Sequence, residues 1–326
     1  MARLCKEMGI SDNFLANLKA NKIFTVSDYI QEETEKLANI CNTSFKEVLE
    51  VRQQLITNFA ALPVNGASAY QQLLANSALI SSGIEKLDEL LGGGFLTGTV
   101  TELCGVSGDG KTQLCVAIAA NITATLKQAV HYVDTKNDFS AHRVLQILRS
   151  RNLSEVDCKS ALEKIQVIKI NSIYELMSYL HSLRKSLSDE EILFPRAVII
   201  DAVPPLYFPL MSSDTNQGFG LLNHVMTTIK SIATEYHMLF LVVNLASSYV
   251  NSESAPADKE EEEEKDQVVA DVRPMLGRYW LHAPHTRLLV SKLNTEDSHR
   301  LVRVLKSTSL PLGKSCVVNI STAGVV

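Results

Sequence analysis

The sequence predicts an α/β fold, in which a mostly parallel sheet with antiparallel C-terminal strands follows a small all-α domain. Three observations predict it. Residues 1–60 show helical periodicity, apolar runs of strand length then alternate with helix-length segments, and the last quarter has three strand-like runs with no helix between them. A chain of 326 residues has room for such a core and an appended domain.

Residues 1–60 are predicted to form a bundle of three or four helices, because their apolar side chains recur at intervals of three and four. These side chains are Phe14, Leu15, Leu18, Leu37, Ile40, Cys41, Val48, Leu49, Val51, Leu55 and Ile56. Short breaks separate the helices, and we expect N-caps at Ser27 and at Thr43 or Ser44. Proline and an Asn-Gly pair then interrupt the pattern, which predicts a linker over residues 61–80.

Residues 81–326 are predicted to form the α/β core. Strands are expected at 99–104, 129–134, 165–170, 197–201 and 238–244, and helices at 111–126, 140–149, 172–186 and 220–235. Continuous apolar strands that alternate with helices indicate a parallel sheet buried on both faces. The runs at 287–293, 300–305 and 315–320 predict antiparallel strands at one edge.

The net charge of −5 comes from one stretch of the chain. Residues 251–273 hold nine acids and three bases, including the glutamate run 260–264, so the remaining residues sum to +1. A run of like charges repels itself and cannot pack, and we expect a mobile acidic loop over residues 246–276. The overall composition, 46% apolar and 21% charged, excludes collagen-like and wholly disordered chains.

The sequence features that bear on cellular location favour a reducing compartment. No apolar stretch approaches the roughly 20 residues of a membrane helix, and the N-terminus lacks the apolar core of a secretory signal. The six cysteines contain no Cys-x-x-Cys pair, which argues against a zinc ribbon and for free thiols in the cytosol or nucleus.

Residues 105–112 match the phosphate-loop pattern G-x-x-x-x-G-K-[ST]. The ATP-binding residues predicted from it are Gly105, Val106, Ser107, Gly108, Asp109, Gly110, Lys111 and Thr112. Glycines let backbone N–H groups face the phosphates, Lys111 reaches the β- and γ-phosphates, and the Thr112 hydroxyl can bind Mg²⁺. The predicted strand before the loop and helix after it favour this interpretation over an ordinary glycine-rich turn.

Asp201 is the second predicted magnesium ligand. It ends an apolar strand about 90 residues after the phosphate loop, and P-loop ATPases hold Mg²⁺ through an aspartate in that position, often by way of water. Many strands end in aspartate for structural reasons, so the prediction depends on the loop. Together the two motifs predict ATP and Mg²⁺ as cofactors.

With these motifs in hand, the chain resembles the RecA-like recombinases, and among them the eukaryotic Rad-type recombinases and their paralogues. The matching stretches are residues 82–94, 97–98, 101–103, 132–135, the strand of Asp201, and 277–280. The resemblance runs from about residue 10 to the end, and the linker sequence at 62–67 is most similar to the D-type recombination-mediator paralogues. It implies a RecA-like ATPase core, and we also assign Arg143 to the ATP-binding residues.

Two departures from the family pattern predict weak hydrolysis. The family's Asp-Thr-Glu-Gly element supplies a glutamate that orients the attacking water, but Lys136 stands at that position. Losing such a base costs about 10²–10⁴-fold in rate, so we expect slow hydrolysis unless another group or a neighbouring subunit supplies the carboxylate. No catalytic residue is assigned. The family's Asn-Gln pair reads Asn244-Leu245 here, and Leu245 cannot hydrogen-bond a γ-phosphate.

The two loops that hold DNA in a recombinase are altered as well. The first, residues 202–220, contains no Lys or Arg, and its aromatic residues could stack on bases or pack against protein. The second contains the glutamate run and repels phosphates. We therefore expect contact with single-stranded or branched DNA mainly within a complex. Two sets of basic residues could make this DNA contact. They are Arg143, Arg149 and Arg151, or Arg300, Arg303 and Lys306. The alternative is that each set only forms a solvated surface.

The N-terminal domain and the linker favour protein partners. Residues 40–44 match a family hairpin that holds the DNA backbone but lack its glycine. Recombinase filaments use a linker Phe-x-x-Ala, and this linker has no such phenylalanine, so we expect Ala69 and Tyr70 to contact a partner or the chain's own core. The resemblance implies a C-type paralogue at the N-terminal domain and a smaller paralogue at the core.

Other candidate residues receive structural roles. His282 and His285 have no carboxylate or cysteine beside them to complete a metal site, and we interpret them as a loop pair. Cys104 and Cys115 lie on apolar elements and are expected in the core. Arg287 begins a strand, where a structural ion pair is favoured over catalysis.

We therefore expect an ATP-binding subunit of a nuclear, heteromeric recombinase-paralogue complex that assists homologous recombination repair of double-strand breaks and stalled forks, with weak ATP hydrolysis. The alternative is an autonomous DNA-dependent ATPase with strand-exchange activity. Lys136, Leu245 and the acidic loop weigh against it. A small-molecule P-loop kinase would leave the helical domain and the antiparallel strands unexplained.

Overall fold

The computed structural model describes residues 12–59, 63–188, 194–211, 215–249, 271–293 and 298–326. The chain divides into two compact units, Met1–Gln71 and Gln72–Val326. Within the described residues of the first unit, four helices precede the linker: α2 (Asp12–Ala20), α3 (Val26–Gln31), α4 (Thr34–Cys41) and α5 (Phe45–Phe59). The predicted helical N-terminal region is confirmed, and its core combines aromatic and aliphatic side chains. The buried residues are Phe14, Leu18, Ile23, Tyr29, Leu37, Cys41, Val48 and Leu55.

One of the expected helix caps is wrong and the other is confirmed. Helix α3 begins after Thr25, whose side chain accepts from the Asp28 N–H while Asp28 accepts from the Thr25 N–H. This capping box places Ser27 inside the helix, not at its cap. Ser44 caps α5, because its hydroxyl accepts from the Glu47 N–H and the Glu47 carboxylate accepts from the Ser44 N–H.

The segment predicted as a linker contains regular structure. Helix α6 (Gly66–Asn76) has no buried residue, and strand β1 (Leu79–Ile80) pairs with β2 (Phe95–Leu96) in a small antiparallel sheet. Helix α7 (Glu85–Leu90) lies between these two strands in the chain and buries Leu87.

The second unit is built on a large sheet whose strand order is β12-β11-β10-β9-β3-β7-β6-β4-β5. The strands of its parallel part are β3 (Val100–Gly105), β4 (Ala129–Asp134), β5 (Ile165–Lys169), β6 (Pro195–Asp201), β7 (Leu239–Tyr249) and β9 (Thr286–Lys292). The antiparallel strands are β10 (His299–Lys306), β11 (Ser315–Ser321) and β12 (Gly324–Val325). The predicted mostly parallel sheet with antiparallel C-terminal strands is thus confirmed.

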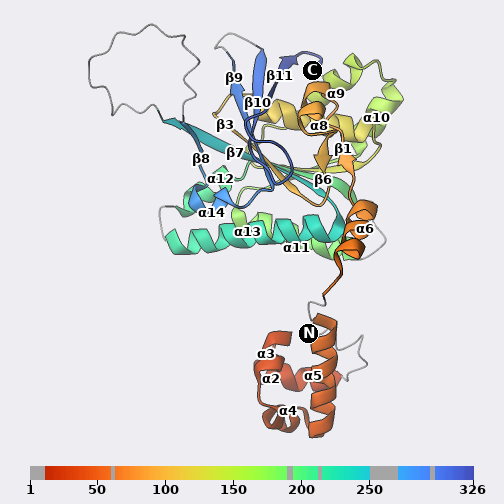
Figure 1. Ribbon diagram of the computed structural model, residues 1–326, viewed down its shortest axis with the longest axis vertical. Coiled ribbons are helices and arrows are strands. Elements are labelled where there is room, and N and C mark those ends of the chain that lie inside the picture. The colour runs from red at the N-terminus through yellow and green to blue at the C-terminus, as the bar shows by residue number, and fades with distance from the viewer. Residues whose placement is uncertain (1–11, 60–62, 189–193, 212–214, 250–270, 294–297) are drawn as a thin grey trace, which may run out of the picture. The chain divides into compact units, whose positions relative to one another are not determined.

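Helices cover both faces of this sheet (Figure 1). Those of one face are α8 (Lys111–Ala124), α9 (Ala141–Ser150) and α10 (Glu155–Glu163), and those of the other are α11 (Ile173–Ser188) and α13 (Thr215–Tyr236). Successive strand residues therefore enter different cores, as the alternation of side chains along a strand requires. In β7, Leu241 belongs to the first core, whereas Phe240 and Val242 belong to the second.

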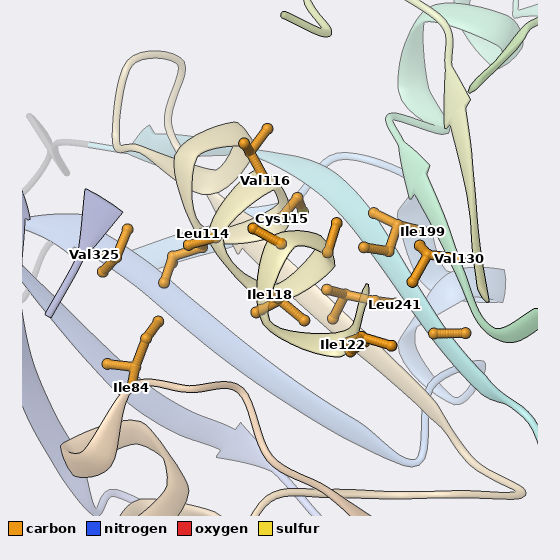
Figure 2. Close-up of a cluster of buried hydrophobic side chains, with 14 of the residues drawn as sticks. Ile84, Leu114, Cys115, Val116, Ile118, Ile122, Val130, Ile199, Leu241 and Val325 are labelled. Carbon is orange, nitrogen blue, oxygen red and sulfur yellow. The ribbon is translucent and has the colours of Figure 1, made fainter. Parts of the chain in front are cut away.

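Helix α8 lies at the centre of the first core and carries the residues that follow the phosphate loop. Twelve of its 14 residues are buried, so it is apolar around most of its circumference, as expected for a helix enclosed by a sheet and other helices. Figure 2 shows its side chains among strand residues Val130, Ile199 and Leu241. This packing fixes the N-terminus of α8 against the sheet.

No helix in the described parts of the chain combines the length and apolarity needed to cross a membrane.

The range 246–276, predicted as a mobile loop, includes regular structure at both ends. Strand β7 continues to Tyr249, and β8 (Asp271–Pro274) pairs with it in antiparallel orientation. Helix α14 (Gly277–Leu281) follows directly and buries Trp280. The glutamate run lies outside the described residues.

Candidate nucleotide-binding site

The phosphate loop lies between β3 and α8, and two of its glycines are required by close contacts. A Cβ on Gly105 would lie 2.2 Å from the Val290 carbonyl oxygen. Gly110 has a φ of 91°, and a Cβ there would lie 2.3 Å from Ile320 Cδ1. A side chain at Gly105 would clash with the backbone of β9, and at Gly110 the positive φ strains any other residue. The backbone of the loop therefore lies close to β9 and β11.

The Lys111 ammonium lies inside the curve of this loop. It donates to the carbonyl oxygens of Gly105 and Val106 at 2.8 and 2.7 Å, and Asp109 accepts from the Val106 N–H at 2.7 Å. Burial lowers the pKa of Lys111, as does the nearby Lys136 ammonium, and Asp109 opposes both. An ammonium has three N–H donors, so one remains for a phosphate oxygen.

The two predicted magnesium ligands lie in direct contact. Thr112 donates its hydroxyl to Asp201 Oδ2 at 2.7 Å, and Tyr132 donates to the same oxygen at 3.0 Å. Asp201 is only 1% exposed. A carboxylate and a hydroxyl are hard oxygen ligands of the kind that Mg²⁺ prefers, so the donor set fits this ion.

The Lys136 ammonium lies against both Thr112 and Asp201. Its Nζ lies 3.0 Å from Asp201 Oδ1, 3.3 Å from Thr112 Oγ1 and 3.2 Å from Asp138 Oδ2. Burial disfavours the charge of the ammonium, but Asp201 and Asp138 together raise the pKa of Lys136 above its ordinary value. A protonated lysine thus contacts both residues that were predicted to hold a metal.

The loop that carries Lys136 is organised by Asp134 at the end of β4. The Asp134 carboxylate accepts from the N–H groups of Lys136 (3.1 Å), Asp138 (3.2 Å) and Phe139 (3.1 Å). Thr135 adds a link to the next strand, because its hydroxyl donates to the Ala202 carbonyl at 2.8 Å. Charge-assisted bonds to backbone N–H groups are strong, so the Lys136 backbone is well fixed beside Asp201.

Arg143 lies near the loop but is held by other groups. Its Nε donates to Gln113 Oε1 at 2.9 Å, and its two terminal nitrogens donate to the carbonyls of Thr322 and Ser321. Gln113 directly follows Thr112 in α8, so the guanidinium joins α9, α8 and the C-terminal end of β11.

A second polar cluster lies under the phosphate loop, within the sheet. Glu102 of β3 is fully buried and accepts from Arg287, from Asn244 Nδ2 at 2.6 Å and from Trp280 Nε1 at 3.0 Å. Arg287 also donates to the Trp280 carbonyl at 3.1 Å. The structural ion pair expected for Arg287 is confirmed, and the side chain of Asn244 is directed to Glu102.

The first set of basic residues considered for DNA contact is engaged within the chain. Arg149 forms an exposed ion pair with Glu155 at 2.9 Å, and Arg151 donates to Asn121 Oδ1 at 3.0 Å. Arg143 contacts Gln113, so each of the three guanidiniums has a partner within the chain.

Two of the three residues in the second basic set, Arg300 and Lys306, are also engaged within the chain. Arg300 donates to the Asp109 carbonyl at 3.1 Å, which places it against the phosphate loop. Lys306 donates to the carbonyls of Leu281 and Pro284, and Arg303 has a buried Nε. These residues are distributed along β10 and serve different neighbours.

His285, considered above as a metal ligand, and the two cysteines expected in the core have structural roles in the fold. His285 Nδ1 accepts from the Val100 N–H at 2.9 Å, and burial together with Lys230 and Lys306 lowers the pKa of His285. Cys104 and Cys115 are fully buried, as expected, and burial raises the pKa of Cys104 to about 12. The residues that the structure describes contain no cluster of ligands suited to a transition metal.

Ala69 and Tyr70, the predicted partner residues, lie on α6. Both are exposed, and Tyr70 is 61% accessible. Leu73 and Leu74 on the same helix are 59% and 60% accessible. Large apolar side chains gathered on one exposed helix are typical of a protein-interaction surface.

Sequence reasoning missed three residues of the site: Tyr132, Asp138 and Glu102. Tyr132 and Glu102 were quoted only as part of family-like stretches, although a glutamate inside an apolar strand signals a buried ion pair. Asp138 could have been found from its spacing, since it is a carboxylate two residues after Lys136.

The comparisons with known proteins agree with this geometry. Residues 75–326 match the Rad51 family, and residues 1–58 match the RAD51D N-terminal domain family. DNA repair protein RAD51 homolog 4 of Bos taurus is 31% identical over 329 residues, which cover 99% of this chain and 95% of that protein. Its Mus musculus counterpart is 32% identical over 330 residues (99% and 94%), and DNA repair protein RAD51 homolog 2 of Homo sapiens is 25% identical over 345 residues (98% and 88%).

Proposed function

Because the chain belongs to the Rad51 family and has a role in recombination repair, we propose that it is an ATP-binding subunit of a heteromeric paralogue complex. In this role it assists homologous recombination repair of double-strand breaks and stalled forks in the nucleus. It binds ATP, hydrolyses it weakly and joins sister paralogues.

ATP binding is assigned to residues 105–112 and Arg143. The loop carries the phosphates on its backbone N–H groups, and Lys111 adds a charge-assisted bond. Thr112 and Asp201 would hold the Mg²⁺, which supplies neutralisation of phosphate charge when bound. Arg143 is included because its guanidinium lies beside Gln113, the residue that follows Thr112.

The position of Lys136 supports weak hydrolysis. It stands where the family has a glutamate, and its ammonium lies 3.0 Å from Asp201. An ammonium cannot accept a proton from the attacking water. The neighbouring carboxylate, Asp138, forms an ion pair with Lys136 at 3.2 Å, so it is held away from the role of a general base.

Replacing Lys136 by glutamate is expected to raise ATP turnover at least about tenfold, because a general base typically contributes about 10²–10⁴-fold. Lys136→Gln removes the same ammonium without adding a base, and it should leave turnover low. Both are measured as phosphate release by the full chain, with and without single-stranded DNA. Equal rates for the two variants would place the defect elsewhere, with Leu245 as the next candidate, and fast DNA-stimulated hydrolysis by the unaltered chain would favour the autonomous ATPase.

Partner binding is assigned to the N-terminal unit and to α6. We propose that the N-terminal unit contacts a C-type paralogue and that the core contacts a smaller paralogue. The exposed Tyr70, Leu73 and Leu74 support a docking role for α6, and Ala69 lies beside them. Since five of the six residues in the two basic sets have intramolecular partners, DNA reaches this subunit mainly through the complex.

Tyr70→Ala is expected to weaken binding of the sister paralogues about 30-fold or more, because a buried interface tyrosine contributes about 2 kcal/mol or more. Tyr174→Ala is a matched control, since Tyr174 is an equally exposed tyrosine (57%) on α11. The measurement is retention of untagged paralogues on the tagged chain, with and without ATP. Full retention by Tyr70→Ala would exclude α6 as the docking element, and no retention by the unaltered chain would argue against a heteromeric complex.

A further inference from the structure

The ammonium of Lys136 lies against the two residues that would hold Mg²⁺. It is 3.0 Å from Asp201 Oδ1 and 3.3 Å from Thr112 Oγ1. A monovalent ammonium and a divalent ion that share the same ligands repel each other strongly at such short range. Lys136 and Mg²⁺ are therefore competitors for Asp201 and Thr112.

Contacts on several sides hold the lysine in this position. Asp138 binds the ammonium from the solvent side at 3.2 Å, and Asp134 fixes the Lys136 backbone through its N–H. The side chain of Lys136 is 29% exposed, whereas that of Asp201 is 1% exposed. The buried carboxylate thus has its cation supplied by the chain, as a buried charge requires.

We propose that Lys136 is a tethered cation that takes over the role of Mg²⁺ in nucleotide binding, so that this chain binds nucleoside di- and triphosphates with little dependence on the metal. This inference rests on the proposed ATP binding at residues 105–112.

The chemistry of the ammonium suits this role. Lysine acts as a point charge with three freely rotating donors. The contact with Asp138 is the exposed one, with 55% of the carboxylate side chain accessible, and exposed ion pairs contribute little. Lys136 can therefore exchange Asp138 for a phosphate oxygen while it keeps Asp201. Together with Lys111, it would place two ammonium groups on the phosphates.

The test measures affinity instead of turnover. The full chain is titrated with fluorescent ADP and ATP analogues, once in EDTA and once in millimolar Mg²⁺. The unaltered chain is expected to change affinity by less than about threefold between the two conditions, because the charge-assisted bonds from lysine are present in both. Lys136→Met should lose at least about tenfold in EDTA and recover when Mg²⁺ is added, since the metal can then enter the site.

Two further variants separate charge from structure. Lys136→Arg keeps a cation and should retain metal-independent binding. Lys159→Met removes an exposed lysine of α10 and should behave as the unaltered chain. Thermal unfolding of each variant verifies that it is folded.

Each outcome is decisive. Binding by the unaltered chain that requires Mg²⁺ would overturn the tethered-cation role and leave nucleotide binding intact. Metal-independent binding by Lys136→Met would also overturn it, because Lys136 would not be the cause. Failure of every variant to bind nucleotide in either condition would overturn the proposed function itself.

Discussion

Lys111→Ala is expected to weaken ATP and ADP binding by about 100-fold, because a bond between an ammonium and a phosphate contributes about 1.5–3 kcal/mol and Lys111 makes it at close range. The ammonium is only 6% exposed and is already aligned by the Gly105 and Val106 carbonyls at 2.8 and 2.7 Å. Little conformational entropy is therefore lost when the nucleotide binds. Fluorescence titration of the full chain, in Mg²⁺ and in EDTA, gives the affinity.

Two controls make this result specific. Lys159→Ala removes an exposed lysine outside the site and should leave affinity unchanged. Thermal unfolding verifies that Lys111→Ala is folded, and a loss of about 1–3 kcal/mol in stability is expected because the buried Gly105 carbonyl loses its donor. An unchanged affinity for ATP would mean that residues 105–112 are not the phosphate-binding loop.

The fold could be predicted because its signals are local. The strands β3, β4, β6 and β7 are mainly apolar runs. Helix α8 is apolar around most of its circumference, whereas α9, α11 and α13 each have an apolar face. Helix α10 was missed because only Cys158 and Ala161 of its residues are buried, which leaves no apolar stripe to detect. Strand β7 was predicted too short, because its polar end at Ser247 is ordered by pairing with Arg273 of β8, a partner that periodicity does not reveal.

The phosphate loop could be predicted for the same reason, since its residues are contiguous and their chemistry is local. The contact between Lys136 and Asp201 could not, because it depends on the pairing of β4 with β6, in which Asp134 lies opposite Asp201. The sequence identified Lys136 as a missing base. Only the register of the two strands shows that the Lys136 ammonium also lies against Asp201 and Thr112, the predicted metal ligands.

Arg287→Met is expected to destabilise the core by about 3–5 kcal/mol, which is the usual cost of leaving a buried charge without its partner. Glu102 is 0% exposed and Arg287 5% exposed, and the ion pair joins β3 to β9 directly below the phosphate loop. After the substitution, Glu102 keeps only the neutral donors Asn244 and Trp280. Urea or thermal unfolding of the full chain measures the loss.

The pH dependence of this loss identifies its cause. Burial raises the pKa of Glu102, and the Arg287 guanidinium is the main group that opposes this rise. Without Arg287 the folded-state pKa lies well above the unfolded one, so the folded state binds the additional proton. Stability of the variant is then highest at low pH and falls as pH rises through that pKa. The deficit relative to the unaltered chain should therefore be smaller in mild acid than at neutral pH.

A double variant separates the effect of charge from that of packing. In Glu102→Gln/Arg287→Met the amide oxygen still accepts from Asn244 and Trp280, but no buried charge remains, so about half or more of the lost stability should return. Its stability should also lose the pH dependence of the single variant. A loss that is equal at both pH values, or that the second substitution does not relieve, would show that packing around Arg287, and not its charge, stabilises this part of the sheet.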